Sequence, residues 1–135
     1  MDIKLINFDK DFFESLEGNE HILLVESGFY HVILIEEKKA GIVGFFHSKK
    51  SKKEGFIQII LAPEFRGKGF LKISEDLLAK KYELKKLYAT ILNDNIASIK
   101  SHLNAGFTYL PEEEQNRLRN LGLLDIDKVR LVKKY

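Results

Sequence analysis

The stretch 63–71, PEFRGKGFL, places a glycine-rich turn directly before a helix. It holds two of the chain's nine glycines and one of its two prolines. Residues 70–83 carry apolar side chains at helical spacing with Lys and Glu opposite them, which predicts an amphipathic helix. This helix would begin near Gly69 without the Ser, Thr, Asp or Asn cap that stabilises a helix start by about 1 kcal/mol. Another group should therefore accept hydrogen bonds from its first backbone N–H groups.

A turn of this composition suits a phosphate group. Glycines leave the backbone amides bare, and the helix dipole adds roughly half a positive charge at the helix start. Arg66 and Lys68 strengthen that field, although a turn capped by water with two surface cations fits the same residues. Two nucleotide-binding motifs are excluded. A P-loop needs a hydroxyl residue after its Lys, where this chain has Gly69, and a dinucleotide-binding turn needs glycine at position 72, which is Lys72.

The rest of the chain alternates strand and helix patterns around this turn. Three neighbouring strands precede it and predict an antiparallel meander, and the order of the elements predicts an α/β fold with a mixed sheet. Segment 20–30 fits either a short helix or a strand, and segment 112–124 fits either a helix or a long loop. The expected strands are 2–8, 29–37, 42–48, 56–61, 87–92 and 128–135, and the expected helices are 9–18, 70–83 and 96–107, with connections at 38–41 and 49–55.

Composition limits the classes of function. A chain of 135 residues fits one domain, which we place over 1–135. A net charge of +2, no Cys, four scattered His and no long apolar run argue against a nucleic-acid or membrane partner, a disulfide, a cysteine nucleophile or a metal site. The basic run KKSKK at 49–53 has no aromatic platform beside it, so we interpret it as a solvated loop rather than a nucleic-acid contact. We expect a cytoplasmic protein.

A second group of polar residues lies in 93–107, NDNIASIKSHLNAGF. At 100° per residue, Asn95, Ser98 and His102 fall in one sector of the predicted helix. The expected apolar stripe beside them consists of Ile96, Ile99 and Leu103. Each polar residue also has a structural interpretation: a helix N-cap, an ordinary helix serine, and a histidine favoured by the dipole at the C-terminal turn. Gly106 fits the left-handed position that ends a helix, with Phe107 supplying the apolar contact of a Schellman motif.

The two motifs together resemble those of the GNAT superfamily of acyl-CoA-dependent N-acetyltransferases. In that family a pyrophosphate-binding turn, [QR]-x-x-G-x-[GA], precedes a helix, and a later helix carries N-x-x-[AS]-x-x-x-Y-x-x-x-G-F. Here the first motif reads Arg66-Gly67-Lys68-Gly69-Phe70-Leu71, and the second keeps Asn95, Ser98, Gly106 and Phe107. Two positions depart from the pattern, because Leu71 replaces a small residue and His102 replaces Tyr. The resemblance covers residues 41–110 well and the two ends by topology only.

The resemblance implies a fold and an activity. The fold would be a mixed, mostly antiparallel sheet of about six to seven strands flanked by about four helices, with a V-shaped cofactor cleft. The activity would be transfer of an acetyl group from acetyl-CoA to a primary amine of a small molecule, peptide or protein by direct attack on the thioester. The residues that would bind the cofactor are Ile59, Ile60, Leu61, Arg66, Gly67, Lys68, Gly69, Phe70, Leu71, Asn95 and Ser98.

The resemblance leaves the proton-transfer groups open. His102 stands where the family has the acid that protonates the leaving thiolate, and it is either that acid or a structural residue. No base stands out: Gln58 occupies a strand where some relatives carry Glu, but an amide cannot accept a proton, which leaves Glu54, His47 or a water chain as candidates. The replaced Tyr and the missing Glu also fit a non-catalytic acyl-CoA-binding module of the same fold.

The amine acceptor cannot be read from the sequence. In such folds specificity lies in the first helical region and in the connection to the final strand, here residues 9–30 and 111–127. The oligomeric state is open as well, a homodimer included.

Overall fold

The computed structural model describes residues 1–135, which form a seven-stranded sheet and four α-helices. In sheet order the strands are β1 (Ile3–Asn7), β2 (Phe29–Ile35), β3 (Lys38–His47), β4 (Glu54–Leu61), β5 (Lys86–Leu92), β7 (Lys128–Lys134) and β6 (Thr108–Tyr109). The helices are α1 (Lys10–Ser15), α2 (Phe70–Lys81), α3 (Ile96–Asn104) and α4 (Glu112–Asn120), with 3-10 turns η1 (Asn19–His21) and η2 (Pro63–Phe65). Neighbouring strands are antiparallel except β4 and β5. The predicted mixed sheet is confirmed.

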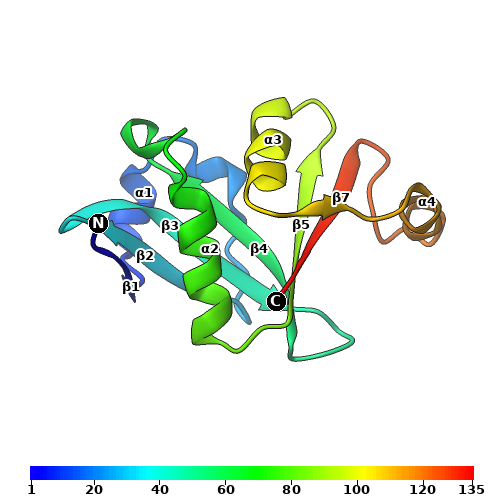
Figure 1. The fold of residues 1–135 in the computed structure, drawn as a ribbon, viewed down its shortest axis with the longest axis horizontal. Coiled ribbons are helices and arrows are strands. Elements are labelled where there is room, and N and C mark those ends of the chain that lie inside the picture. The colour runs from blue at the N-terminus through cyan, green and yellow to red at the C-terminus, as the bar shows by residue number, and fades with distance from the viewer.

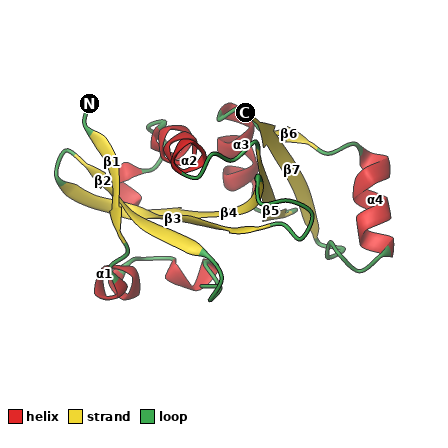
Figure 2. Cartoon of the chain, turned by 90° about the horizontal axis from the view of Figure 1, so that it is seen from below, coloured by secondary structure: helices red, strands yellow, loops and turns green.

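The sheet separates two layers of helices. α2 and α3 lie over one face, whereas α1 and η1 lie against the other face beneath β1, β2 and β3 (Figure 1, Figure 2). A cluster of 18 buried residues, with Phe45 and Leu78 at its centre, fills the space under α2 and α3. A smaller cluster of 5 residues around Val32 and Ile42 lies on the α1 side. None of the helices has the length and apolar character that crossing a bilayer requires.

The ladder between β4 and β5 is split. These two strands pair only at their start, where Glu54 faces Lys86 and Phe56 faces Tyr88. β4 nevertheless stays paired with β3 as far as Leu61, and β5 stays paired with β7 to its end. Beyond the pair Phe56 and Tyr88 the two strands therefore diverge, and we call this opening the split. It confirms the V-shaped opening that the sequence resemblance implies.

The predicted turn at 38–41 is wrong by two residues. The chain reverses at Glu36 and Glu37, whose φ angles are 47° and 66°. Positive φ at both central residues gives a two-residue hairpin whose twist matches that of the flanking strands. Gly41 belongs to β3 instead, and it is required there because an added Cβ would lie 2.2 Å from the carbonyl oxygen of Ile60 on β4.

The structure shows the conformation of the two segments for which the sequence allows alternatives, and it corrects the predicted apolar face of α3. Segment 20–30 is neither a helix nor a strand, because only the single turn η1 forms before β2 begins. Segment 112–124 contains the helix α4. The predicted apolar stripe of α3 is largely wrong: Ile99 is buried, but Ile96 is 64% and Leu103 39% exposed, whereas His102 is buried at 4%. The imidazole of His102 can be buried because a buried side chain of α2 forms a hydrogen bond with it, as described below.

Candidate functional site

The glycine turn presents a row of unpaired amides. Gly67 and Gly69 have φ angles of 71° and 84°, and nothing lies within 4 Å of an added Cβ at either residue. α2 begins at Phe70 with no side-chain cap, as the sequence predicts. None of the backbone N–H groups from Gly67 to Lys72 donates to an acceptor in the chain. The turn therefore offers bare donors at the positive end of a helix dipole, and this arrangement suits an anion.

The side chains of the turn leave these amides open. Arg66 folds back on the preceding strand, where its Nε donates to the carbonyl oxygen of Leu61 at 2.9 Å, so its guanidinium braces the turn against β4. Lys68 is exposed and free to approach a ligand. Phe70 is buried, and Leu71, the residue that departs from the family pattern, packs against the core. The larger side chain at position 71 thus points away from the amide row.

The edge of β4 that faces the split offers backbone groups too. The amide of Ser48 donates to the Glu54 carbonyl and that of Ala62 to the Ala40 carbonyl, so both ends of β4 are bonded to β3. Because backbone groups alternate in direction along a strand, the odd-numbered residues direct theirs toward β5. Ile59 and Leu61 therefore face the split, whereas the backbone of Ile60 faces β3. The Leu61 carbonyl accepts a hydrogen bond from Arg66. The N–H of Leu61 and both the N–H and the carbonyl of Ile59 therefore remain available to a ligand in the split.

Asn95 lies across the split from the glycine turn. α2 follows the end of β4 and α3 follows the end of β5, so the starts of both helices flank the open end of the split. The Oδ1 of Asn95 accepts from the Ser98 amide at 3.2 Å and caps α3, while its side-chain NH₂ donates to nothing in the chain. The structure therefore brings Asn95 and Ser98 to the same opening as residues 66–71.

His102 is paired with a residue that sequence reasoning missed. Its Nδ1 lies 2.9 Å from the Ser98 carbonyl, which can only accept, so Nδ1 carries a proton and donates. Its Nε2 lies 2.9 Å from Oε2 of Glu75 on α2, and the two side chains are 5% and 1% exposed. Burial opposes the charged imidazole, but the hydrogen bond to Glu75 and its charge outweigh burial and raise the pKa of His102. Burial raises the pKa of Glu75, although its hydrogen bond to His102 acts in the opposite direction.

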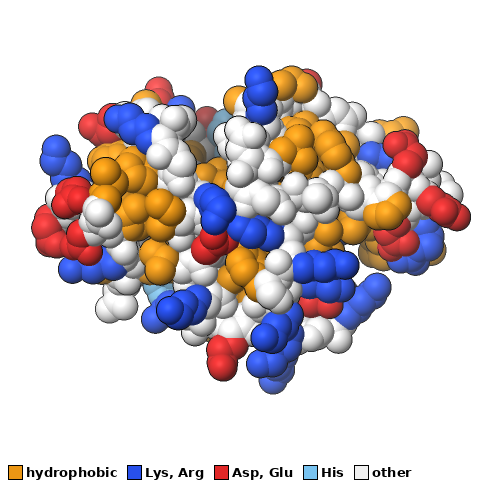
Figure 3. Space-filling view, in the orientation of Figure 1, with side chains coloured by type: hydrophobic (Ala, Val, Ile, Leu, Met, Phe, Trp, Pro, Cys, Tyr) orange, Lys and Arg blue, Asp and Glu red, His pale blue; other side chains and the backbone are white.

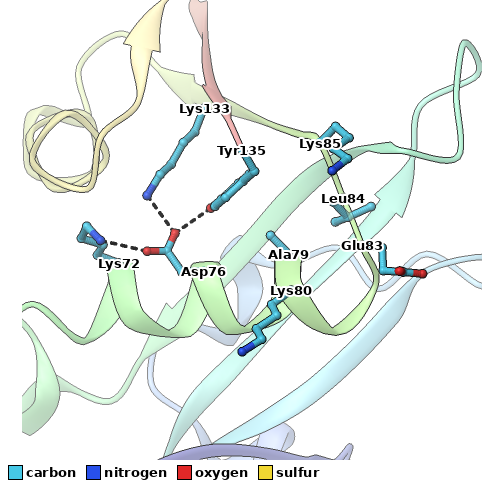
Figure 4. A pocket seen from close by; sticks show the side chains of 9 residues that line it. All are labelled: Lys72, Asp76, Ala79, Lys80, Glu83, Leu84, Lys85, Lys133 and Tyr135. Atoms are coloured by element: carbon cyan, nitrogen blue, oxygen red, sulfur yellow. Dashed lines mark hydrogen bonds and ion pairs between the residues drawn. The ribbon is translucent and has the colours of Figure 1, made fainter.

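A second network lies beside this pair on the outer side of α2. Asp76 accepts from Lys72 at 2.9 Å, from Lys133 at 2.8 Å and from the hydroxyl of Tyr135 at 2.8 Å (Figure 4). Partial burial acts to raise the pKa of Asp76, but these three hydrogen bonds hold it below its ordinary value. These four residues line a surface pocket of about 590 Å³, which Lys80 also lines.

Figure 3 shows Lys and Arg side chains gathered in this lower central region of the helix-bearing face. Apart from Lys72 at the end of the amide run, the pocket contains no residue of the glycine turn or of the split. Its polar contacts tie α2 to the end of β7, which pairs with the start of β5 at the closed end of the split.

The two candidate bases, and the Gln58 that stands where some relatives carry Glu, lie in different places. His47 contacts Phe29 and Phe45 on the helix-bearing face, and Glu54 lies at the closed end of the split, 3.9 Å from Lys86. Gln58 lies beside the split itself but is engaged. Its Oε1 accepts from the Tyr30 hydroxyl at 2.6 Å, and its Nε2 donates to the Leu23 carbonyl at 3.0 Å. The structure thus brings no free carboxylate into the split.

Comparison with known proteins agrees with this geometry. A family model described as "Acetyltransferase (GNAT) domain" matches residues 10–108. No curated protein matches the sequence significantly. Among solved structures, the Campylobacter jejuni N-acetyltransferase PseH in complex with acetyl coenzyme A is 16% identical, with a TM-score of 0.68 over 98% of each chain.

Two further solved structures have the same fold. A Bacillus subtilis acetyltransferase in complex with CoA is 19% identical, with a TM-score of 0.69 over 98% of this chain and 97% of its own. The F149A mutant of the Vibrio cholerae spermidine N-acetyltransferase SpeG is 19% identical, with a TM-score of 0.68 over 99% of this chain and 95% of its own. At these identities the likeness shows the fold, while the family model spans most of the sequence. The chain belongs to the GNAT family of acetyltransferases.

Proposed function

We propose that this protein is an N-acetyltransferase that transfers an acetyl group from acetyl-CoA to a primary amine by direct attack. The observation that carries the proposal is the run of amides from Gly67 to Lys72, which have no acceptor in the chain and stand at the open end of the split. A pyrophosphate supplies the acceptors that such a run lacks. Membership of the GNAT family, and the fold shared with proteins bound to acetyl-CoA and CoA, support this ligand.

The residues present fit the rest of the cofactor. The backbone groups of Ile59 and the N–H of Leu61 face the split and would pair with the amides of the pantetheine arm as an added strand would. The free NH₂ of Asn95 would donate to the same arm from the other side of the opening. Lys68 would add charge beside the pyrophosphate, and Arg66 would hold the turn in place through Leu61.

The chemistry requires positioning more than acid or base strength. Acetyl-CoA supplies an activated acyl carbon whose bond to sulfur breaks when the amine nitrogen attacks it. A backbone N–H of β4 in the split would polarise the acyl carbonyl by donating a hydrogen bond to its oxygen. The amine loses one proton and the thiolate gains one, so the net reaction needs no further reactant. His102 would donate that proton from Nε2 only after leaving Glu75, because Nδ1 is held by Ser98.

One observation favours a second candidate, a non-catalytic acyl-CoA-binding module. Both side chains that stand at the family's acid and base positions are engaged elsewhere, His102 with Glu75 and Gln58 with Tyr30. A module of this kind would bind CoA and leave the thioester intact. Thiol release from acetyl-CoA in the presence of primary amines separates the two candidates, since the module predicts none.

Amide chemical shifts of the labelled protein test the cofactor site. Titration with CoA should shift the amides of Gly67 to Lys72 together with Ile59 and Leu61. Pantetheine, which lacks the pyrophosphate, should shift the β4 amides and leave the glycine turn unchanged. If CoA moves the β4 amides without moving those of the turn, the pyrophosphate assignment is wrong.

A further inference from the structure

We infer that the acceptor is a monoamine carried on an aromatic or aliphatic group, and not a polyamine. This inference rests on the proposed function and adds the chemical class of the second substrate. The cofactor's pyrophosphate site lies at the start of α2, on the face of the sheet that carries α2 and α3. The acceptor must then reach the split from the opposite face. No helix lies under β5 on that face (Figure 2).

The floor of that opening is an aromatic row. Phe46, Phe56, Tyr88 and Val132 are successive cross-strand partners on β3, β4, β5 and β7, so their side chains share one face. The Phe46 and Phe56 rings stack at 5.3 Å, and Phe56 and Tyr88 lie 5.4 Å apart. Because Phe56 and Tyr88 form the last pair before β4 and β5 diverge, the row lies directly at the apex of the split.

An apolar loop is fixed beside this floor. Gln58 and the Tyr30 hydroxyl bind the backbone of the loop 22–28, since Gln58 donates to the Leu23 carbonyl and the Val25 amide donates to Tyr30 at 2.9 Å. The ring of Tyr30 occupies the space of an absent side chain, because a Cβ added to Gly44 would lie 2.3 Å from it. The loop held in this way presents Leu23, which is 75% exposed. Gln58 and Tyr30 are therefore positioning residues for this wall.

The charges around the floor disfavour a second cationic centre on the acceptor. The guanidinium of Arg130 lies 4.9 Å from the Phe56 ring centre, and its Nε donates to Thr90 at 2.8 Å beside the split. On the other side of the row, the carboxylate of Glu54 is balanced by Lys86 at 3.9 Å. The Arg130 guanidinium thus places a positive charge directly over a ring of the floor, where it repels the additional ammonium groups of a polyamine.

Calorimetry on the protein saturated with CoA tests the inference without requiring turnover. Phenethylamine should bind at least about tenfold more tightly than spermidine, and more tightly than ethanolamine, which lacks a ring. Phe56→Leu should weaken phenethylamine binding by roughly two- to tenfold, the range that aromatic pairs contribute. Arg130→Gln should strengthen spermidine binding. Phe29→Leu, which changes an exposed ring on the helix-bearing face, is the matched control and should change neither.

The outcomes separate this inference from the function on which it rests. If CoA binds but spermidine binds more tightly than phenethylamine, the inference is wrong and the acetyl-CoA site stands. Equal phenethylamine affinity in the wild type and in Phe56→Leu also overturns it. If CoA itself fails to bind, the proposed function falls first.

Discussion

Replacing Gly69 by Glu places an anion at the glycine turn. Gly69 has a φ angle of 84° and nothing within 4 Å of an added Cβ, so the new Cβ meets no atom and the folding cost is the backbone strain of about 1–2 kcal/mol. The carboxylate would stand beside the proposed pyrophosphate. At about 6 Å and an effective dielectric constant of about 40, two like unit charges repel by about 1.4 kcal/mol, and two phosphate charges double this. CoA affinity should therefore fall roughly a hundredfold.

Gly122→Glu is the matched control for this variant. Gly122 has a φ angle of 72° and equally open surroundings, but it lies in the loop after α4 rather than beside the split. Both variants should lose similar thermal stability, whereas only Gly69→Glu should lose affinity in a calorimetric titration with CoA. An affinity within about twofold of the wild type for Gly69→Glu, or an equal loss in Gly122→Glu, would refute the assignment of the turn.

Three other substitutions and a pH series test the structure around the split. His102→Gln removes the partner of buried Glu75 and should lower the free energy of unfolding in urea by about 3 kcal/mol; a loss below about 1 kcal/mol would mean that the pair does not form. Because folding raises the pKa of His102, its contribution to the free energy of unfolding is complete below about pH 6.5, the unfolded value, and is lost as the pH rises through the folded pKa. The stability of the wild type should therefore fall over that pH range. An equal fall in His102→Gln would contradict the pair. Gly41→Ala forces a Cβ against a carbonyl of β4 and should cost about 1–3 kcal/mol, so an unchanged melting temperature would show that the close approach is absent. Tyr30→Phe should speed hydrogen exchange of the Val25 amide without unfolding the protein, and unchanged protection would show that the loop is held by other contacts.

The two local motifs could be read from the sequence because their geometry depends on near neighbours. Gly106 has a φ angle of 99°, and the Phe107 amide donates to the His102 carbonyl as a Schellman motif requires. The uncapped start of α2 at Gly69 follows from the absence of a capping residue. Turn and cap chemistry is set within a few residues, so a single sequence carries it.

The contacts between elements could not be read in the same way. The burial of His102 depends on Glu75, which lies 27 residues earlier on another helix. A signal was nevertheless present: Glu75 follows Leu71 by four residues and precedes Leu78 by three, so a carboxylate occupies the buried stripe of α2. The split itself depends on where two strands stop pairing, and neither strand's pattern marks that point.

The hydrogen bonds that hold the loop 22–28 beside the split could not be predicted from the sequence either. The sequence shows only that Gln58 stands where some relatives carry Glu, whereas in the structure its side chain binds Tyr30 and the Leu23 carbonyl. The partner residues come from three separate segments and share no sequence motif. Segment 9–30, where we expect specificity to lie, does supply the loop beside the opening.

Mass spectrometry of a reaction with acetyl-CoA and a panel of primary amines, aromatic monoamines included, tests the proposed activity most directly. The wild type should release free CoA and acetylated amine in equal amounts, and Gly69→Glu should release much less of both at a cofactor concentration that just saturates the wild type. If CoA binds at the glycine turn and no amine gains an acetyl group, the protein is a CoA-binding module, and the proposed transfer reaction is contradicted.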